Sequence, residues 1–162
     1  MTKVFQGNYI EVTVEDSIEK VFLRHSVHTF LVTDQGKIRV TVEKKLGSDE
    51  TKEKIQGGVL DDGENPLECA KRELLEELGC EAGDWKLFDV QEQSGTVNDT
   101  RHYFIASNLV MMSDNTDGEV LQTADYTIDE LYEKSMTGTF SPFTRAAIAK
   151  LHYQVTKNII CL

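Results

Sequence analysis

Residues 58–80 read GVLDDGENPLECAKRELLEELGC, a segment that begins with a glycine loop and continues into a helix-like run rich in glutamate. An α-helix turns by about 100° per residue, so Glu73, Glu76 and Glu77 project from one helix within an arc of roughly 100°. Like charges at these spacings destabilise an exposed helix by about 0.2–0.5 kcal/mol per pair. A solvated face gives no reason to group them, whereas a hard cation does. We therefore interpret the three glutamates as ligands of a divalent metal ion.

The helix that carries these glutamates has clear ends. Asn65 is a suitable N-cap, Pro66 fits the first helical position, and Glu68 completes a capping box three residues after Asn65. Gly79 supplies the left-handed residue that commonly ends a helix, so the pattern predicts a helix of about thirteen residues. Its apolar stripe, on the side opposite the glutamates, consists of Leu67, Ala70, Leu74 and Leu78.

A glycine-punctuated loop, residues 56–64, precedes this helix and allows the backbone to approach an ion or a phosphate closely. Glu64 would add a fourth carboxylate, and a carbonyl near Gly58 would add a neutral oxygen. Oxygen ligands without a partnering Cys or His indicate Mg²⁺ or Mn²⁺ and argue against zinc or copper. The alternative is an acidic, salt-bridged surface helix, because many Glu-rich helices are only solvated faces.

The complete spacing resembles the Nudix box of the Nudix hydrolase family. Eight fixed positions match, namely Gly58, Glu64, Arg72, Glu73, Leu74, Glu76, Glu77 and Gly79, and Cys80 replaces the usual aliphatic residue at the last position. The resemblance implies an α/β fold of the α+β type, in which a mixed β-sheet is sandwiched between helices. It also implies hydrolysis of a nucleoside diphosphate linked to another group.

The resemblance further implies how the metal is held. Glu73, Glu76 and Glu77 would bind Mg²⁺ or Mn²⁺, and the Gly58 carbonyl would be a backbone ligand. Glu64 would be a further ligand or a support.

The catalytic roles follow from the same resemblance. Arg72 would orient a box glutamate, and water is the expected nucleophile. A carboxylate near several others can have its pKa raised toward the value that a general base needs. Two sources of that base stay open: Glu76 or Glu77 within the box, or Glu119 in the polar run of residues 113–119.

Length and composition agree with the one catalytic domain that the resemblance implies, and we expect it to be soluble and to span residues 1–162. With 162 residues, 40% of them hydrophobic, the chain is long enough to bury a core and short for two ordinary domains. Its three cysteines show no metal or redox spacing, which suits a reducing compartment and indicates the cytoplasm. A net charge of −11 argues against long nucleic acid and anionic membrane as partners. The expected partner is a small nucleoside diphosphate derivative.

Alternating patterns predict an N-terminal third made of strands, at residues 9–14, 18–24, 27–33 and 37–43, and further strands at 85–90, 101–106 and 120–126. Thr127 with Glu130 gives a second capping box, and Ser141 followed by Pro142 opens a third helix. This layout resembles the ADP-ribose and nucleotide-sugar pyrophosphatase branch of the family. Residues 54–57 read KIQG where that branch tends to carry a Glu and a Pro-Ala pair.

In that branch the N-terminal strands often serve dimerisation. We therefore expect a homodimer that uses residues near 4–24, within an N-terminal strand extension over residues 1–24. Arg101, which follows a polar loop, and Lys54, which flanks the loop before the box, are the candidate substrate-binding residues. The expected substrate is a nucleotide sugar or ADP-ribose. Two alternatives stay open: a Nudix hydrolase of nucleoside triphosphates or dinucleoside polyphosphates, and a non-catalytic nucleotide-binding regulator, which would be expected to have lost box glutamates.

Overall fold

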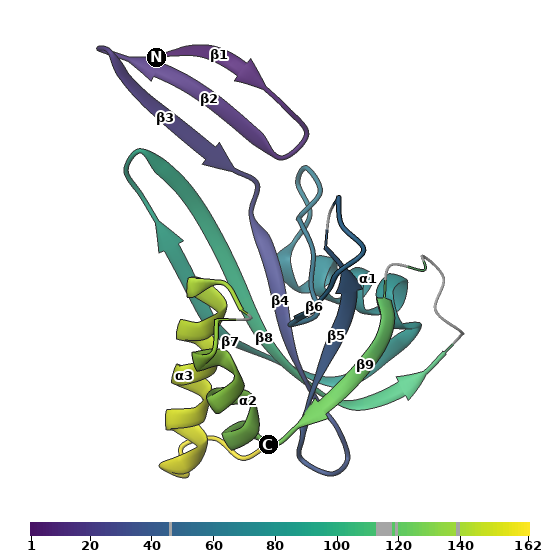
Figure 1. Ribbon diagram of the computed structural model, residues 1–162. Coiled ribbons are helices and arrows are strands. Elements are labelled where there is room, and N and C mark those ends of the chain that lie inside the picture. Colours follow the sequence, from purple (N-terminus) through teal and green to yellow (C-terminus); the bar gives the residue numbers. More distant parts are fainter. Residues whose placement is uncertain (46, 113–117, 119, 139) are drawn as a thin grey trace.

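A computed structural model describes residues 1–45, 47–112, 118, 120–138 and 140–162. It shows a curled sheet with helices on both faces and a smaller group of strands, β1 to β3, that extends away from it (Figure 1). In chain order the elements are β1 (Thr2–Gln6), β2 (Ile10–Glu15), β3 (Ile18–Leu23), β4 (Ser26–Val32), β5 (Ile38–Lys44), β6 (Thr51–Lys54), α1 (Pro66–Leu78), β7 (Cys80–Gln93), β8 (Val97–Met111), β9 (Val120–Tyr126), α2 (Ile128–Met136) and α3 (Pro142–Thr156).

The described strands form one mixed sheet in the order β1-β2-β3-β8-β4-β5-β6, with β7 paired to β8 and β9 paired to β5. β4 and β8 run parallel, whereas β5 is antiparallel to β4, β6 and β9. β3 joins β8 through two parallel register pairs, Val21–Val97 and Phe22–Asn98. The N-terminal strands are thus attached to the main sheet by a short junction.

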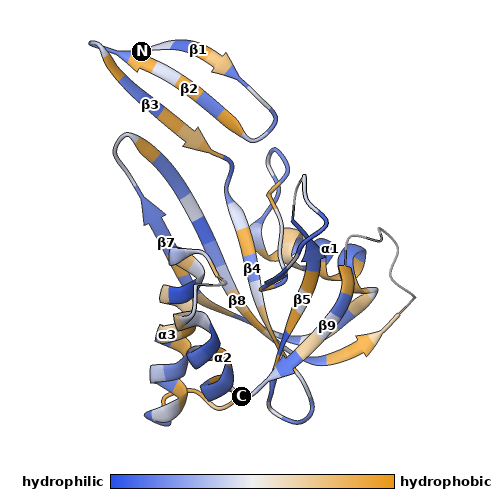
Figure 2. Cartoon of the chain, viewed as in Figure 1, coloured by the Kyte–Doolittle hydropathy of each residue, from blue (hydrophilic) through white to orange (hydrophobic). Residues whose placement is uncertain are grey.

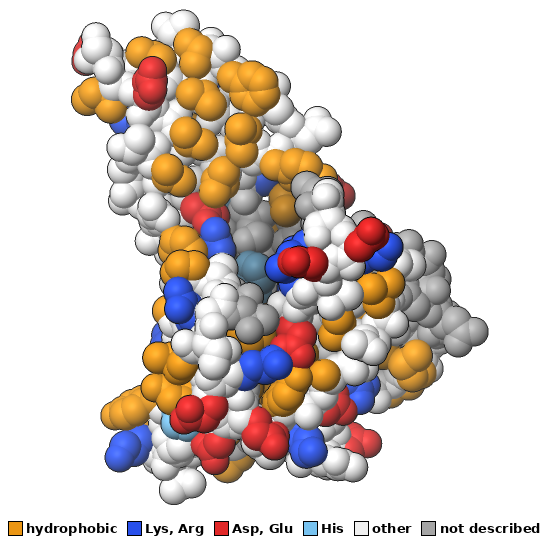
Figure 3. Space-filling view, in the orientation of Figure 1, with side chains coloured by type: hydrophobic (Ala, Val, Ile, Leu, Met, Phe, Trp, Pro, Cys, Tyr) orange, Lys and Arg blue, Asp and Glu red, His pale blue; other side chains and the backbone are white. Residues whose placement is uncertain are grey.

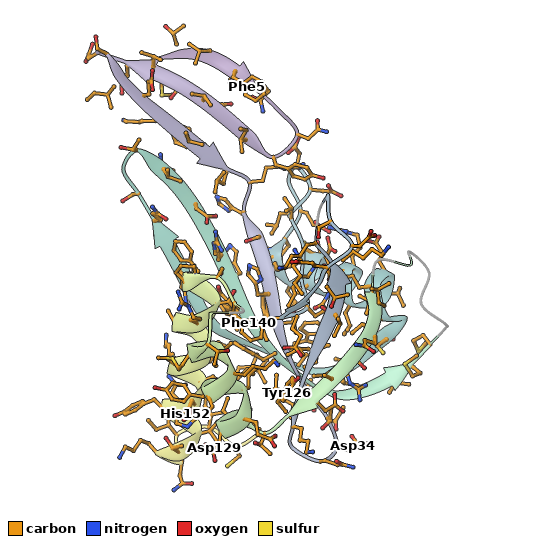
Figure 4. The ribbon with its side chains drawn as sticks, viewed as in Figure 1. Phe5, Asp34, Tyr126, Asp129, Phe140 and His152 are labelled. Atoms are coloured by element: carbon orange, nitrogen blue, oxygen red, sulfur yellow. The ribbon has the colours of Figure 1, made fainter. Side chains whose placement is uncertain are left out.

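The central strand β4 shows how the layers are built. Its residues alternate between two buried faces, as the pleat of a strand requires. Val27 and Leu31 pack with α1, whereas Phe30 and Val32 pack with α2 and α3. Figure 2 shows the hydrophobic residues of β4 and β5 between these helices, and Figure 4 places Phe140 on the side covered by α2 and α3. The predicted mixed sheet sandwiched between helices is confirmed.

The helix ends follow the local sequence signals. The Asn65 side chain accepts a hydrogen bond from the Leu67 amide at 2.9 Å, and Gly79 closes α1 in the left-handed conformation, with φ of 61°. Thr127 and Glu130 form a reciprocal capping box at the start of α2. Within the described part of the chain, no helix has both the length and the hydrophobicity needed to cross a membrane.

The sheet is larger than the sequence pattern predicted. β1 and β6 were not expected, and β7 and β8 extend well beyond the predicted residues 85–90 and 101–106. Every residue of β1 is exposed, and β7 with β8 continues as a half-exposed ribbon. Such strands are held by backbone pairing, so they lack the alternation of polar and apolar residues that marks a strand with one buried face.

Leu74 tests the packing of α1 on the sheet. It is fully buried near Leu31 and Ala106, whereas the next residue, Leu75, is 40% exposed. Leu74→Ala should lower the free energy of unfolding by about 2–5 kcal/mol, because it removes buried methyl groups and leaves a cavity. The matched control, Leu75→Ala, should lower it by less than about 1 kcal/mol. Urea unfolding followed by circular dichroism measures both, and equal losses would contradict this packing.

Candidate active site

The loop before α1 is fastened to β4 by backbone hydrogen bonds. The Val27 amide donates to the Gly58 carbonyl at 2.9 Å, and the Thr29 amide donates to the Gln56 carbonyl at 2.7 Å. Gly57 lies between these two bonds with φ of 149°, and a Cβ there would overlap the Val27 carbonyl. Since that neighbour is backbone, position 57 requires glycine. The loop therefore has a fixed place relative to the sheet.

Gly58 brings the loop backbone against the carboxylate of Glu73. A Cβ at position 58 would overlap that carboxylate, so the missing side chain is what allows the close approach. The Glu73 side chain is largely buried here, and burial raises its pKa, while the neighbouring Arg72 guanidinium opposes the rise. Glu73 is thus held at the junction of the loop and α1.

Arg72 organises three of the carboxylates. Its Nε and Nη2 donate to Oε1 and Oε2 of Glu64 at 2.9 and 3.0 Å, a bidentate pair, and the Asp61 amide also donates to Glu64. Its Nη1 donates to Glu73 at 2.9 Å and to Glu76 at 3.0 Å. The hydrogen bonds from Arg72 are the main reason that the pKa of Glu64 falls to about 2. Both Glu64 oxygens are engaged, which favours a supporting role for this residue over direct metal binding.

Glu77 is paired with a different cation, the ammonium group of Lys54. The Lys54 ammonium lies 3.0 Å from Glu77 Oε1 and 2.8 Å from Glu43 Oε1. Glu77 Oε2 is buried without a hydrogen-bond partner. Burial raises the pKa of Glu77 to about 7, although the contact with Lys54 opposes the rise. Burial would lower the pKa of Lys54, but the two carboxylates outweigh it and raise that pKa.

The two faces of α1 are less separate than the sequence predicted. Ala70 and Leu74 are buried as expected, but Glu77 is also buried, with 3% of its surface exposed, whereas Glu76 is exposed. The sequence pattern predicted the direction of Glu77 around the helix, one turn from Glu73, but it did not predict that Glu77 is buried. The reason is that side chains from β5 and β6 reach this end of the helix and enclose it.

The box glutamates are divided between the two cations, Arg72 and Lys54. As a result, among the residues that the structure describes, no three Asp, Glu, His or Cys side chains are already gathered as metal ligands. The donor set nevertheless fits a hard divalent ion, because it consists of carboxylate oxygens and includes the unpartnered Oε2 of Glu77. Glu73 and Glu77 lie one helical turn apart and are the natural pair of ligands.

A cavity of about 460 Å³ opens over this site, a size within the usual range for small-molecule pockets. Its charged lining is balanced, with three acids and three cations: Asp61, Glu73, Glu77, Arg24, Lys54 and Arg72. Asn8 and Tyr9, from the turn between β1 and β2, complete the wall together with the loop glycines and Val59. Figure 3 shows the molecule hollowed beneath the N-terminal strands, with Lys, Arg and His side chains visible there.

The sequence reasoning missed four residues of this region: Asn8, Tyr9, Arg24 and Glu43. Each lies in or beside a predicted strand, and nothing in the local pattern distinguishes it from an ordinary strand residue. Arg24 donates to Asp62 at 2.9 Å, which holds the guanidinium at the mouth of the loop. These four residues can be identified only from the structure, which brings them together around the box.

One predicted substrate-binding residue lies elsewhere. Arg101 does not line the cavity, because its Nε donates to Asp99 at 2.6 Å and its guanidinium lies 4.1 Å from the centre of the Phe143 ring. Its assignment to substrate binding stays a prediction. Glu119, the candidate loop base, lies outside the described residues. His28 stacks on Tyr103, and burial lowers its pKa to about 3, which fits a structural role.

Comparison with known proteins gives concordant matches. Residues 22–147 match the NUDIX domain. The chain is 26% identical over 141 residues to ADP-ribose pyrophosphatase of Bacillus subtilis (strain 168), and 26% identical over 143 residues to methanol dehydrogenase activator of Bacillus methanolicus. Each match covers 79% of this chain and 76% of the relative.

Two solved structures share the fold. The crystal structure of an ADP compounds hydrolase matches with a TM-score of 0.73 and 18% identity, covering 96% of this chain and 91% of that one. A NUDIX hydrolase from Nitrosomonas europaea matches with a TM-score of 0.65 and 20% identity, covering 86% of this chain and 96% of that one.

Glu77 gives the metal-free protein a dependence on pH. Because folding raises the pKa of this carboxyl from 4.5 to about 7, the folded state binds more protons than the unfolded state between these values. The contribution of Glu77 to stability is therefore present at low pH and is lost as the pH rises through about 7. Wild type should lose more stability than Glu77→Gln between about pH 5 and about pH 8, since the amide does not titrate. Thermal unfolding in the presence of a chelator measures the difference, and parallel pH profiles for the two proteins would rule out the assigned shift.

Proposed function

The chain belongs to the NUDIX family, whose domain matches residues 22–147, and on that premise we propose that this Nudix hydrolase cleaves the pyrophosphate linkage of ADP-ribose or a related ADP compound. The observation that carries the proposal is the meeting of the box carboxylates with a cavity of about 460 Å³. The names of two similar proteins, ADP-ribose pyrophosphatase and ADP compounds hydrolase, support this substrate class. Nucleotide sugars are the alternative substrates nearest in chemistry.

The charge balance of the cavity supports a requirement for metal. Its three acids and three cations leave no surplus positive charge for a diphosphate. Glu73, Glu76 and Glu77, with the second lone pair of the Gly58 carbonyl, would hold Mg²⁺ or Mn²⁺. Bound there, the ion supplies neutralisation of the diphosphate oxygens, polarisation of the phosphorus and acidification of water.

The side chains of the chain then position the reactants. Arg72, fixed by its bidentate pair with Glu64, keeps Glu73 and Glu76 in place. Arg24 and Lys54 face the cavity and would contact the diphosphate. The ring of Tyr9 is exposed at the cavity wall and can stack against the adenine ring of the substrate.

The reaction is a simple hydrolysis. The oxygen of a water molecule bonds to one phosphorus, the bridging phosphorus–oxygen bond breaks, and the bridging oxygen leaves on the other phosphate. With ADP-ribose the products are AMP and ribose 5-phosphate. The base that accepts the water proton is proposed among Glu76, Glu77 and Glu119.

Glutamine variants test the proposal. Glu73→Gln and Glu77→Gln should each lower the turnover of ADP-ribose by about 100-fold or more, because a lost ligand removes several kcal/mol of transition-state stabilisation. Glu68→Gln is the matched control: this exposed residue of α1 is not one of the fixed positions of the box, and the variant should retain wild-type turnover. Glu119→Gln should match the first two variants if Glu119 is the base.

The assay should compare products from a panel. ADP-ribose, nucleotide sugars, nucleoside triphosphates and dinucleoside polyphosphates are offered with Mg²⁺ and with Mn²⁺, and AMP and ribose 5-phosphate are detected by chromatography. Wild-type rates from Glu77→Gln at saturating Mg²⁺ would refute the metal assignment. A panel without any product would favour a nucleotide-binding regulator.

We also propose that residues 1–162 form one cytoplasmic catalytic domain that assembles as a homodimer through its N-terminal strands. These strands expose large apolar side chains, Val4, Phe5, Ile10 and Ile18. Figure 3 shows hydrophobic side chains gathered over this part of the surface, and Figure 4 places Phe5 on β1 at a distance from the main sheet. A small sheet with exposed apolar residues gains stability by covering them, and a second copy of the same surface is a suitable partner.

Phe5→Glu tests the dimer. A charge on this apolar surface should shift the protein to a monomer at micromolar concentration, because a buried unpaired carboxylate opposes association. Leu87→Glu, which changes an equally exposed leucine on β7, is the control and should stay dimeric. Light scattering coupled to gel filtration gives the mass of each. A wild-type protein that is monomeric would refute the proposal.

A further inference from the structure

Lys54 lies outside the box in sequence but contacts a box glutamate, Glu77, and a second carboxylate, Glu43. Its ammonium lies 2.8 Å from Glu43 Oε1 and 3.0 Å from Glu77 Oε1, so it bridges β5 and α1 from its own strand, β6. The side chains of Glu43 and Glu77 are 10% and 5% exposed. Lys54 also lines the cavity of the proposed substrate. One cation therefore contacts two buried carboxylates and the substrate cavity.

The charges make this lysine a competitor of metal. Two carboxylates and one ammonium leave a net charge of one negative, and without the ammonium two negative charges would be nearly buried together. Buried carboxylates require a cation close by. The ammonium already takes one oxygen of Glu77, while the other oxygen, Oε2, has no hydrogen-bond partner. A divalent ion that binds Glu77 must therefore offset or replace the contact with Lys54.

Glu43 is a second partner that can hold the Lys54 ammonium when Glu77 binds another cation. Its contact with Lys54 is the shorter of the two and involves no box residue. Thr41 on the same strand donates to the Glu43 carboxylate at 3.3 Å, which helps to hold it. When Glu77 turns to another cation, the ammonium can stay with Glu43 and still face the cavity.

We propose that Lys54 is a tethered counter-ion that competes with the divalent ion for Glu77, and that Glu43 is the anchor that retains the ammonium when the ion binds. This inference rests on the proposed function in one respect, namely that Glu77 is a metal ligand. Lys54 is a positioning residue in this scheme. Its presence keeps the metal-free protein folded around two buried carboxylates, and it weakens the binding of metal.

Mn²⁺ binding, measured by electron paramagnetic resonance on the full chain, tests the competition. Lys54→Met should bind Mn²⁺ at least about ten-fold more tightly than wild type, because it removes a positive charge within about 4 Å of the ligand. Glu43→Gln should bind it more weakly, because the ammonium then has only Glu77 as its partner. Lys52→Met, two residues away on the same strand and exposed, is the control and should bind Mn²⁺ as wild type does.

The double variant, which combines Lys54→Met with Glu43→Gln, separates competition for Glu77 from a general effect of charge on metal binding. Independent charges act additively, whereas an anchor has no role once the ammonium is gone. Glu43→Gln should therefore lose most of its effect in the Lys54→Met background. Metal-free Lys54→Met should also melt at a lower temperature than wild type, and added Mn²⁺ should remove this difference.

The outcomes are distinct. Tighter binding by Lys54→Met with weaker binding by Glu43→Gln supports the proposal. Unchanged or weaker binding by Lys54→Met overturns it, and so does an additive double variant. Circular dichroism shows whether Lys54→Met is folded, and Glu43→Gln tests the anchor independently of that variant. Failure of the proposed function would appear separately, as absence of ADP-ribose hydrolysis by wild type.

Discussion

Carboxylates placed inside a protein need cations, and this constraint governs the whole site. Five glutamates share two basic side chains: Glu64, Glu73 and Glu76 contact Arg72, and Glu43 and Glu77 contact Lys54. A carboxylate without such a partner would take up a proton or disturb the packing around it. The acidic helix can therefore be packed against a loop and two strands before any metal is bound. The rest of the active site is built on this balance.

The helix and its box were predictable because their information is local. Asn65, Pro66 and Gly79 set the ends of α1 through contacts within a few residues, and the structure has the same ends. The spacing of the glutamates along one helix likewise depends only on the helical repeat. The sandwiched sheet was predicted from the family resemblance, and the central strands were predicted from the alternation of polar and apolar residues.

What the sequence did not reveal depends on contacts between distant segments. The burial of Glu77 results from Lys54 and Glu43, which belong to two other strands, so no pattern within the helix could indicate it. The same holds for Arg24 and Tyr9, which reach the cavity from the N-terminal strands. The full length of the β7 and β8 ribbon was not predicted for a different reason: the half-exposed residues beyond 85–90 and 101–106 follow no simple alternation and are held by backbone pairing.

The short junction between β3 and β8 bears on how selectivity can diverge in this fold. Asn8 and Tyr9 lie in the turn between β1 and β2, and this group of strands meets the main sheet through β3 at two register pairs, so sequence change there leaves the contacts of Arg72 and Lys54 intact. The wall of the cavity that these two residues form can thus vary while the box and its two cations stay the same. Changes within residues 1–24 can therefore reshape the mouth of the cavity without any change in the acidic helix.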